Sequence, residues 1–168
     1  VLRSRENSEF KRLLKLQDSP RERRSASRAL LDGDHLIRAY REAGLGEIEV
    51  VAASESALER APLRQLFESV PARSRVVFAD KLFSRLSQVV TPAGLLAVIA
   101  IPEPPPWPET MADALVLERI QDPGNLGSIL RSPQAAGLRD VFLTPGTALA
   151  WSPKVLKSGM GGHFKLRI

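Results

Sequence analysis

The stretch DPGNLGSILR, from Asp122 to Arg131, holds the residue types and spacing that most suggest chemistry. It follows an apolar run and opens a segment with helical spacing, so it lies where a strand ends and a helix begins, the usual ligand crevice of an α/β sheet. Gly124, Gly127 and Arg131 are spaced i, i+3 and i+7, which places them on one helix face. Free amides at a helix start, two positions without side chains and a guanidinium together suit a phosphate group.

These residues do not match the common nucleotide-binding fingerprints. The glycines lack the G-x-G-x-x-G spacing, and no Lys-Ser/Thr pair follows them as in a P-loop. Taken alone, the stretch is better explained as a strand–helix turn whose glycines let layers pack and whose arginine lies at the surface. Asn125 is then a candidate N-cap of the helix, a role compatible with a second one in a site.

Composition excludes several classes of site. The sequence has no cysteine, which excludes disulfides, thiolate metal ligands and a cysteine nucleophile. His35 and His163 lie far apart without ligand spacing, so we expect no metal site. No apolar run approaches the ~20 residues that span a bilayer, and the first residues lack the apolar core of a signal peptide. We therefore expect a soluble, cytoplasmic protein with no membrane partner.

The charge is positive and uneven, with a net charge of +5 for 168 residues. Residues 1–28 hold nine Lys/Arg against four Asp/Glu, and residues 141–168 hold four Lys/Arg and no acid. Two basic ends around a more acidic middle indicate contact with a polyanion. On charge alone, two solvated basic segments are an equally good interpretation.

Helical and strand patterns alternate along the chain, which predicts an α/β fold. The segment SPRERRSASR (19–28) is predicted to be an exposed loop, because it combines a proline, serines and arginines. The patterns predict helices or turns over 6–18, 34–43, 57–70, 81–90, 125–137 and a short helix after 152, and strands near 29–32, 47–53, 75–80, 94–101, 114–120, 140–144 and after the glycines at 159, 161 and 162. The β-α-β pattern over 114–144 predicts parallel strands.

Five prolines between Pro102 and Pro108 mark the best domain boundary. The prediction is an RNA-binding α/β domain over 1–101, a Pro-rich linker over 102–109 and a second domain over 110–168, with few contacts between the two domains. The alternative is a proline-rich surface loop within one domain.

The segments DPGNLGSILRSPQAAGLRDVFLTPG and AWSPKVLKSGMGGHFKLRI resemble the start of the SpoU (TrmH) family of RNA ribose methyltransferases, of the SPOUT superfamily. The resemblance covers residues 114–168. LLDGDHLIRAYREAG and VTPAGLLAVIA are similar, more weakly, to the small ribosomal-protein-like substrate-binding domain that often precedes it.

The resemblance implies 2'-O methylation of a ribose in structured RNA, which we expect to be ribosomal. It further implies S-adenosylmethionine as donor and a homodimer with a knotted Rossmann-like domain. Arg131 falls on the family's catalytic arginine and Asn125 on its asparagine. Pro133 stands where the family has a small helix former. The two later motifs, which carry most of the cofactor pocket, have no counterpart here. We therefore assign no cofactor-binding residue, and expect the 168 residues alone to be inactive.

The remaining candidate residues are those that would contact RNA or its phosphates: Gly124, Gly127, Arg12, Arg21, Arg23, Arg24 and Lys154. Trp107 and Trp151 could stack on bases, although packing is the commoner role of such residues. The sequence leaves two alternatives to a methyltransferase open. The first is a non-catalytic RNA-binding module, and the second is a small phosphate- or nucleotide-binding α/β protein.

Overall fold

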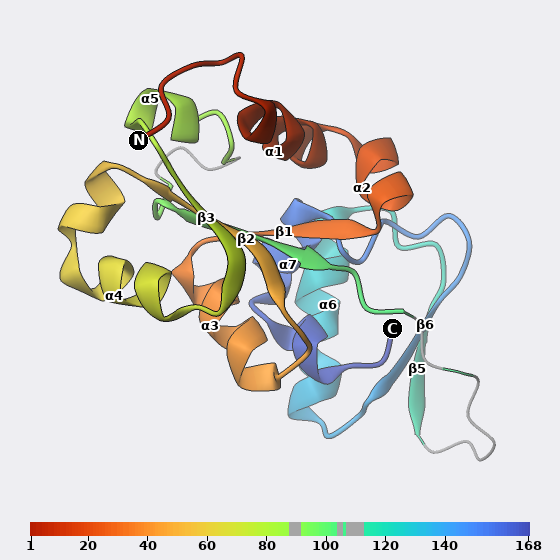
Figure 1. Cartoon of the computed structure of the whole chain (residues 1–168). Helices are drawn as coiled ribbons and strands as arrows, with labels where there is room; N and C mark the ends of the chain where they lie inside the picture. Colours follow the sequence, from red (N-terminus) through yellow and green to blue (C-terminus); the bar gives the residue numbers. More distant parts are fainter. Residues whose placement is uncertain (88–91, 104–105, 107–112) are drawn as a thin grey trace.

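The structure is a computed structural model of the chain, and it describes residues 1–87, 92–103, 106 and 113–168. Strands and helices alternate along much of the chain, as Figure 1 shows, and the fold class is mixed α/β as predicted. In chain order the elements are α1 (Ser8–Asp18), α2 (Pro20–Ala26), β1 (Arg28–Asp32), α3 (Asp34–Ala43), β2 (Ile48–Ser54), the 3₁₀ helix η1 (Ser56–Glu59), α4 (Ala61–Ser69), β3 (Ala72–Phe78), α5 (Asp80–Phe83), β4 (Leu95–Ala100), β5 (Ala114–Leu117), α6 (Pro123–Ala135), β6 (Asp140–Leu143), α7 (Pro153–Gly159) and the 3₁₀ helix η2 (Gly162–Lys165).

The N-terminal half is built on a four-stranded sheet with the order β1-β4-β2-β3. Strands β2 and β3 are parallel, whereas β4 runs antiparallel to both of its neighbours, with Leu30 opposite Val98 and Ala52 opposite Leu96. Successive side chains of a strand point to opposite faces. Strands β1, β2 and β4 carry buried apolar residues on both faces of the sheet. Both faces therefore have to be covered by other elements.

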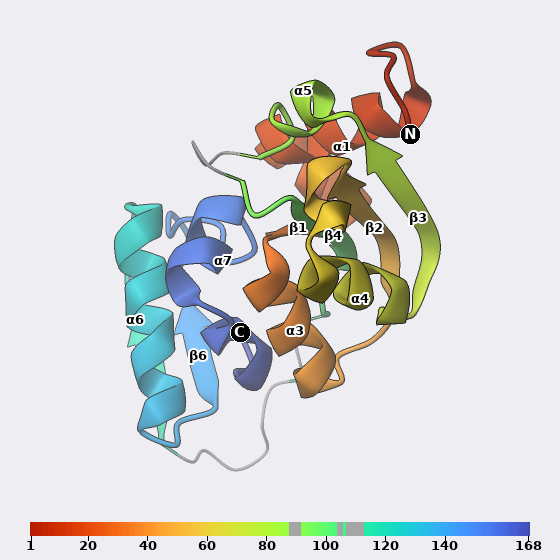
Figure 2. The same ribbon diagram turned by 90° about the vertical axis from the view of Figure 1, so that its left-hand side faces the viewer.

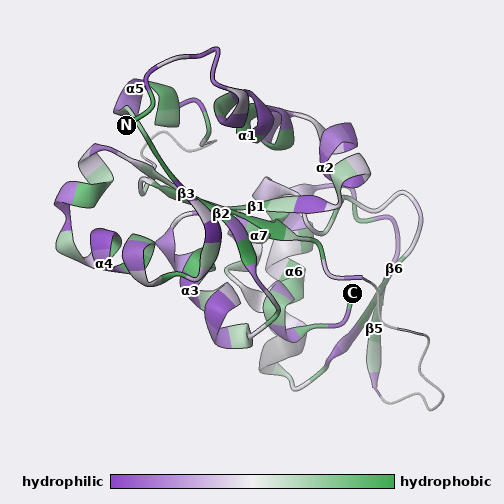
Figure 3. Ribbon diagram, viewed as in Figure 1, coloured by the Kyte–Doolittle hydropathy of each residue, from purple (hydrophilic) through white to green (hydrophobic). Residues whose placement is uncertain are grey.

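Helices cover both faces of this sheet (Figures 1 and 3). Phe10 and Leu13 of α1 and Phe83 of α5 pack on one face. Ile37 of α3 and Leu66 of α4 pack on the other. The hydropathy colouring shows green strands in the middle and purple segments on the outer helices (Figure 3). Apolar burial of this kind explains why α1, α3 and the strands were predictable from their periodicity.

The C-terminal half has a separate two-stranded sheet in which β5 and β6 are parallel, as predicted, with Ala114 opposite Asp140. Helix α6 connects the two strands. Its Leu126 and Leu130 are fully buried with Val141 of β6 and Val155 of α7. This small core fixes the helix that begins with the DPGN turn.

Contacts between the two halves are more extensive than predicted. Leu156 of α7 and Phe164 of η2 are buried in the same core as α3 and α4, and the Phe164 ring packs edge-on against Tyr40 with centroids 5.4 Å apart. Helix α7 therefore lies between both cores, and Figure 2 shows the C-terminal segment beside α3. The proposed boundaries at 101 and 110 stay a prediction, and most of the proposed linker (104–105 and 107–109) lies outside the described residues.

The prediction of a loop over 19–28 is wrong, because residues 20–26 form α2. Ser19 caps this helix by accepting a hydrogen bond from the Glu22 backbone N–H at 3.2 Å, and Pro20 occupies its first turn. The helix is anchored by a cation rather than an apolar stripe. Arg23 Nη1 donates to the carbonyl oxygens of Leu16 and Gln17, at 2.7 and 2.8 Å, at the end of α1.

The predicted last strand is also wrong. After the glycines the chain forms η2, and the described residues there contain only an isolated parallel bridge between Arg167 and Asp140. Gly161 has a φ of +83°, which glycine adopts without strain and which turns the chain into η2.

Candidate active site

The start of α6 is capped by Asp122, not by Asn125. The Asp122 carboxylate accepts the backbone N–H of Asn125 at 2.7 Å, and its carbonyl oxygen accepts that of Leu126 at 3.0 Å. Helix α6 begins at Pro123, so Asn125 lies within its first turn and has an exposed side chain. The interpretation of Asn125 as N-cap is therefore wrong. The Asp-Pro pair was the missed signal, since Asp is favoured at the cap and Pro just after it.

Gly127 is not available for the predicted phosphate cradle, and the surroundings of Gly124 do not favour one. A Cβ on Gly124 would lie 3.0 Å from an oxygen of the Asp122 carboxylate, whose negative charge repels a phosphate. Gly127 is buried against α7, where a Cβ would lie 1.9 Å from Ser158 Oγ and 2.5 Å from the Val155 carbonyl oxygen. Its missing side chain lets two helices approach, as the simpler interpretation of the sequence held.

Arg131 lies one helical turn beyond Gly127 on α6 and is exposed. Among the described residues no hydrogen bond or ion pair involves its guanidinium. The backbone of Arg131 packs against Gly162. A Cβ added to Gly162 would lie 3.2 Å from the Arg131 Cα and 3.0 Å from the Leu130 carbonyl oxygen. A helical side chain leans towards the N-terminus of its helix, so the guanidinium is directed towards the Asn125 end. The packing thus fixes the backbone of Arg131 and leaves its guanidinium available for a ligand.

Pro133 lies inside α6, as predicted. Because proline has no N–H, the Ile129 carbonyl oxygen loses its usual helical donor. The helix ends soon after, where Leu138 N–H donates to the Pro133 carbonyl oxygen at 2.9 Å.

The loops that follow β5 and β6 are bonded to each other at the carboxyl ends of the strands. The Arg119 backbone N–H donates to Thr144 Oγ1 at 3.0 Å, and the Ala148 N–H donates to the Ile120 carbonyl oxygen at 2.8 Å. Arg119 has a φ of +50°, a conformation that costs energy in a residue other than glycine. Both loops are therefore fixed next to the start of α6.

His163 is a structural residue. It is fully buried, and its Nε2 is 2.8 Å from the Ala150 carbonyl oxygen. Burial lowers its pKa from 6.5 to about 4, so the ring is neutral near pH 7. Its burial leaves it unable to contact a phosphate. Trp151 packs beside it, with ring centroids 5.7 Å apart, whereas Trp107 lies outside the described residues.

The basic residues of the N-terminal half fall into two groups. Arg12 is paired with Glu9 and Glu49, and Arg28 also pairs with Glu49. Burial opposes ionisation of Glu49, but the hydrogen bonds and charges of Arg28 and Arg12 outweigh it and lower the pKa of that carboxyl. These arginines stabilise α1 and β1 on β2 and have part of their charge neutralised.

The second group is unpaired among the described residues. Arg21 and Arg24 on α2 and Lys154 on α7 are exposed and make no ion pair within the part of the chain that the structure describes. Arg23 is different, since only 6% of it is exposed and two carbonyls occupy its Nη1. This leaves little of Arg23 for RNA, so Arg21, Arg24 and Lys154 are the stronger candidates.

Within residues 1–87, 92–103, 106 and 113–168, no group of three or more His, Cys, Asp or Glu side chains could hold a metal ion. None of the helices in these ranges is long and apolar enough to cross a membrane.

Comparison with known proteins finds a family model that matches the segment containing Arg131. Residues 113–168 match the SpoU rRNA Methylase family. The chain is 44% identical over 89 residues to the mouse protein "rRNA methyltransferase 3, mitochondrial", which is 49% of the chain and 21% of the relative. It is 30% identical over 171 residues to the Bacillus subtilis protein "23S rRNA (guanosine(2553)-2'-O)-methyltransferase RlmP", which is 99% of the chain and 63% of the relative. The chain therefore spans between a fifth and two thirds of these curated relatives.

Solved structures agree with the sequence matches. A crystal structure described as an RNA 2'-O ribose methyltransferase has a TM-score of 0.80 and 31% identity, over 99% of this chain and 63% of that one. The SpoU methyltransferase AviRb from Streptomyces viridochromogenes, in complex with the cofactor AdoMet, has a TM-score of 0.83 and 24% identity, over 95% of this chain and 61% of that one. The first match covers both halves of the chain in one superposition.

Proposed function

Residues 113–168 belong to the SpoU rRNA methylase family, and from this premise we propose that the protein containing this chain methylates the 2'-hydroxyl of a ribose in RNA, with S-adenosylmethionine as donor. The observation that carries the proposal is Arg131. Arg131 is exposed, and its guanidinium makes no bond among the described residues. It lies on a helix whose start is fixed by Asp122, within the segment that matches the family.

Ribosomal RNA is the proposed substrate class. The Bacillus subtilis relative is named for a 23S rRNA guanosine, and the mouse relative is named an rRNA methyltransferase. The unpaired cations Arg21, Arg24 and Lys154 support binding of an RNA backbone through release of its counterions. The homodimer implied by the sequence resemblance stays a proposal as well.

The donor is proposed from the AdoMet complex of AviRb and not from contacts in this chain. When bound, S-adenosylmethionine supplies an already activated methyl group. Two polar groups in the loops after β5 and β6 are already used by bonds between the loops, from the Arg119 N–H to Thr144 Oγ1 and from the Ala148 N–H to the Ile120 carbonyl oxygen. No cofactor-binding residue is proposed among the described residues.

Methyl transfer to a hydroxyl requires alignment of the reactants and loss of the hydroxyl proton. Arginine is a poor base because its pKa exceeds 12. The role that its chemistry allows Arg131 is electrostatic. Its guanidinium holds the neighbouring phosphate and favours the charge that develops on the 2'-oxygen. Asn125, exposed in the first turn of the same helix, is the second polar side chain that can contact the ribose.

The test is methyl transfer to ribosomal RNA by the full-length protein and its Arg131→Ala variant. We expect turnover to fall on the order of 100-fold or more while RNA affinity changes little, because the interaction is strongest as the oxygen gains charge. Arg131→Lys should recover only part of the rate, since lysine cannot bind a phosphate in bidentate fashion. The matched control is Arg139→Ala, which removes an exposed arginine from the same half. Wild-type turnover by Arg131→Ala would contradict the proposed role.

A further inference from the structure

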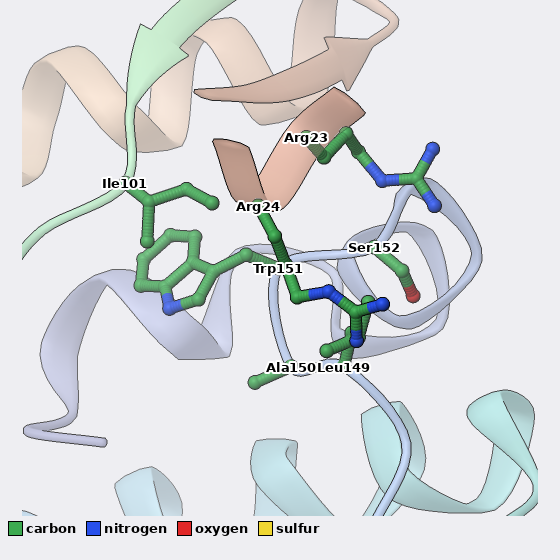
Figure 4. A pocket seen from close by; sticks show the side chains of 7 residues that line it. All are labelled: Arg23, Arg24, Ile101, Leu149, Ala150, Trp151 and Ser152. Carbon is green, nitrogen blue, oxygen red and sulfur yellow. The ribbon is translucent and has the colours of Figure 1, made fainter. Parts of the chain in front are cut away.

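A hollow lies where the two halves of the chain meet. It is lined by Arg23 and Arg24 of α2, by Ile101 after β4, and by residues 149–152 before α7. Figure 4 shows these side chains, which come from three separate segments: the indole of Trp151 lies below Ile101, Arg24 extends towards Leu149 and Ala150, and the guanidinium of Arg23 lies away from the indole. We call this hollow the α2–α7 pocket. None of the residues that line it is acidic.

The positive charge of the α2–α7 pocket is only partly compensated, because the charge of Asp18 acts on Arg23 but no carboxylate pairs with Arg24 among the described residues. Arg24 is exposed and makes no ion pair among the described residues. Arg23 is bonded through Nη1 only to carbonyl oxygens, and its buried Nε has no hydrogen-bond partner in the described part of the chain. Burial lowers the pKa of Arg23, and the charge of nearby Asp18 offsets only part of that effect. An anion placed on the exposed guanidinium of Arg24 would therefore be favoured.

The apolar side of the pocket is a fixed aromatic ring. Trp151 packs against His163 and Phe164, with centroids 5.7 and 6.3 Å apart, and it borders the core of the N-terminal half. These contacts hold the indole in place while part of it stays exposed to the pocket. A fixed indole that lines the same hollow as an unpaired arginine is a combination that binds an unpaired base and its phosphate.

We propose that the α2–α7 pocket binds one unpaired nucleotide of the RNA, with the base against Trp151 and the phosphate on Arg24. This inference rests on the proposed function, because it takes RNA as the substrate. Both halves contribute to the pocket, so a nucleotide bound there spans the junction. Helix α7 begins at the pocket and packs on α6, where Ser158 Oγ lies 3.3 Å from the Pro123 carbonyl oxygen. The bound nucleotide would thereby set the distance from the RNA to Arg131.

The experiment observes Trp151 directly. The full-length protein is labelled with 5-fluorotryptophan, and the Trp151 ¹⁹F resonance is assigned by its loss in Trp151→Phe, which keeps an aromatic ring in the packing. A short single-stranded RNA is titrated in, and total binding is followed separately by fluorescence anisotropy of the RNA. We expect the Trp151 resonance to shift in step with binding, and Arg24→Ala to weaken binding on the order of tenfold.

The control for Arg24→Ala is Arg64→Ala, which removes an exposed arginine from α4, away from the pocket (Figure 1). Equal losses in the two variants, or RNA binding that leaves the Trp151 resonance unmoved, would overturn the pocket while the proposed function stands. Failure of the full-length protein to bind any RNA would instead contradict the proposed function. An acidic peptide that moves the resonance as much as the RNA does would also overturn the inference, because the site would then serve another ligand.

Discussion

Gly127→Ala should destabilise the protein even though alanine favours helices. The substitution gains about 1 kcal/mol of helix propensity in the interior of α6. Against this, the new Cβ would lie 1.9 Å from Ser158 Oγ, 2.5 Å from the Val155 carbonyl oxygen and 2.8 Å from the Gly159 nitrogen. The hydroxyl can rotate away, whereas the two backbone atoms move only if α7 moves.

Overpacking of this kind costs about 1–3 kcal/mol, and two immobile backbone contacts favour the upper end or beyond. The net loss is expected to be about 2 kcal/mol, since the cost exceeds the gain in propensity. For a chain of this size that corresponds to a Tm lower by roughly 4–8 °C. Equilibrium unfolding in urea, with thermal unfolding as a second probe, measures both values.

Two further variants separate the causes. Ser128→Ala changes an exposed position of the same helix and should stay within about 0.5 kcal/mol of wild type. Adding Ser158→Ala to Gly127→Ala removes the contact at 1.9 Å and leaves those at 2.5 and 2.8 Å, so it should restore only part of the loss. If Gly127→Ala is as stable as wild type, the close approach of α6 and α7 does not depend on this glycine and the reasoning fails.

Three other outcomes are expected. Asp122→Ala should cost about 1 kcal/mol in urea unfolding, because α6 loses the cap on the Asn125 N–H; an unchanged midpoint would contradict the cap. Pro133→Ala should be neutral to stabilising in the same assay, since the helix regains a donor for the Ile129 carbonyl, and a clear loss would show that ring packing dominates. The pKa of His163 is about 4 in the folded protein and 6.5 as its ordinary value. The unfolded chain therefore binds the proton first, and stability should fall as the pH drops from 6.5 to 4, by up to about 1.4 kcal/mol per pH unit. His163→Gln should show a shallower pH dependence of Tm over that range, and an equally steep one would refute the assignment.

The predictable elements are those whose apolar residues repeat with the spacing of a helix or form a continuous strand. Helix α1 buries Phe10, Leu13 and Leu16, and β1 and β4 are continuous apolar runs. Helix α2 has no such pattern, because its buried residue is Arg23, held by hydrogen bonds to the end of α1. A search for apolar periodicity does not detect a helix anchored in this way, and its serines and proline favour the loop interpretation.

The elements around the candidate site were predictable, whereas the local roles of its residues were predictable only in part. Strand β5, the turn and helix α6 lie where the pattern placed them, and Arg131 is exposed, as its proposed catalytic role requires. Gly127 was assigned to a ligand because a glycine on a helix has two explanations, close approach of a ligand or of another helix. Only the position of α7 decides between them, and that contact depends on tertiary structure.

The position of Arg131 depends on the N-terminal half through a short series of packed groups. Tyr40 of α3 contacts Phe164, and a Cβ on Gly161 would lie 2.8 Å from the Ala39 Cβ, so η2 is seated closely on α3. Gly162, the next residue, lies against the backbone of Arg131. A displacement of α3 relative to α6 would open these contacts, and a solved structure at 31% identity superposes on both halves together. The residues proposed to bind RNA in the N-terminal half and the arginine of α6 therefore belong to one packed body, so that RNA bound by the first half would be presented to Arg131 at a fixed distance.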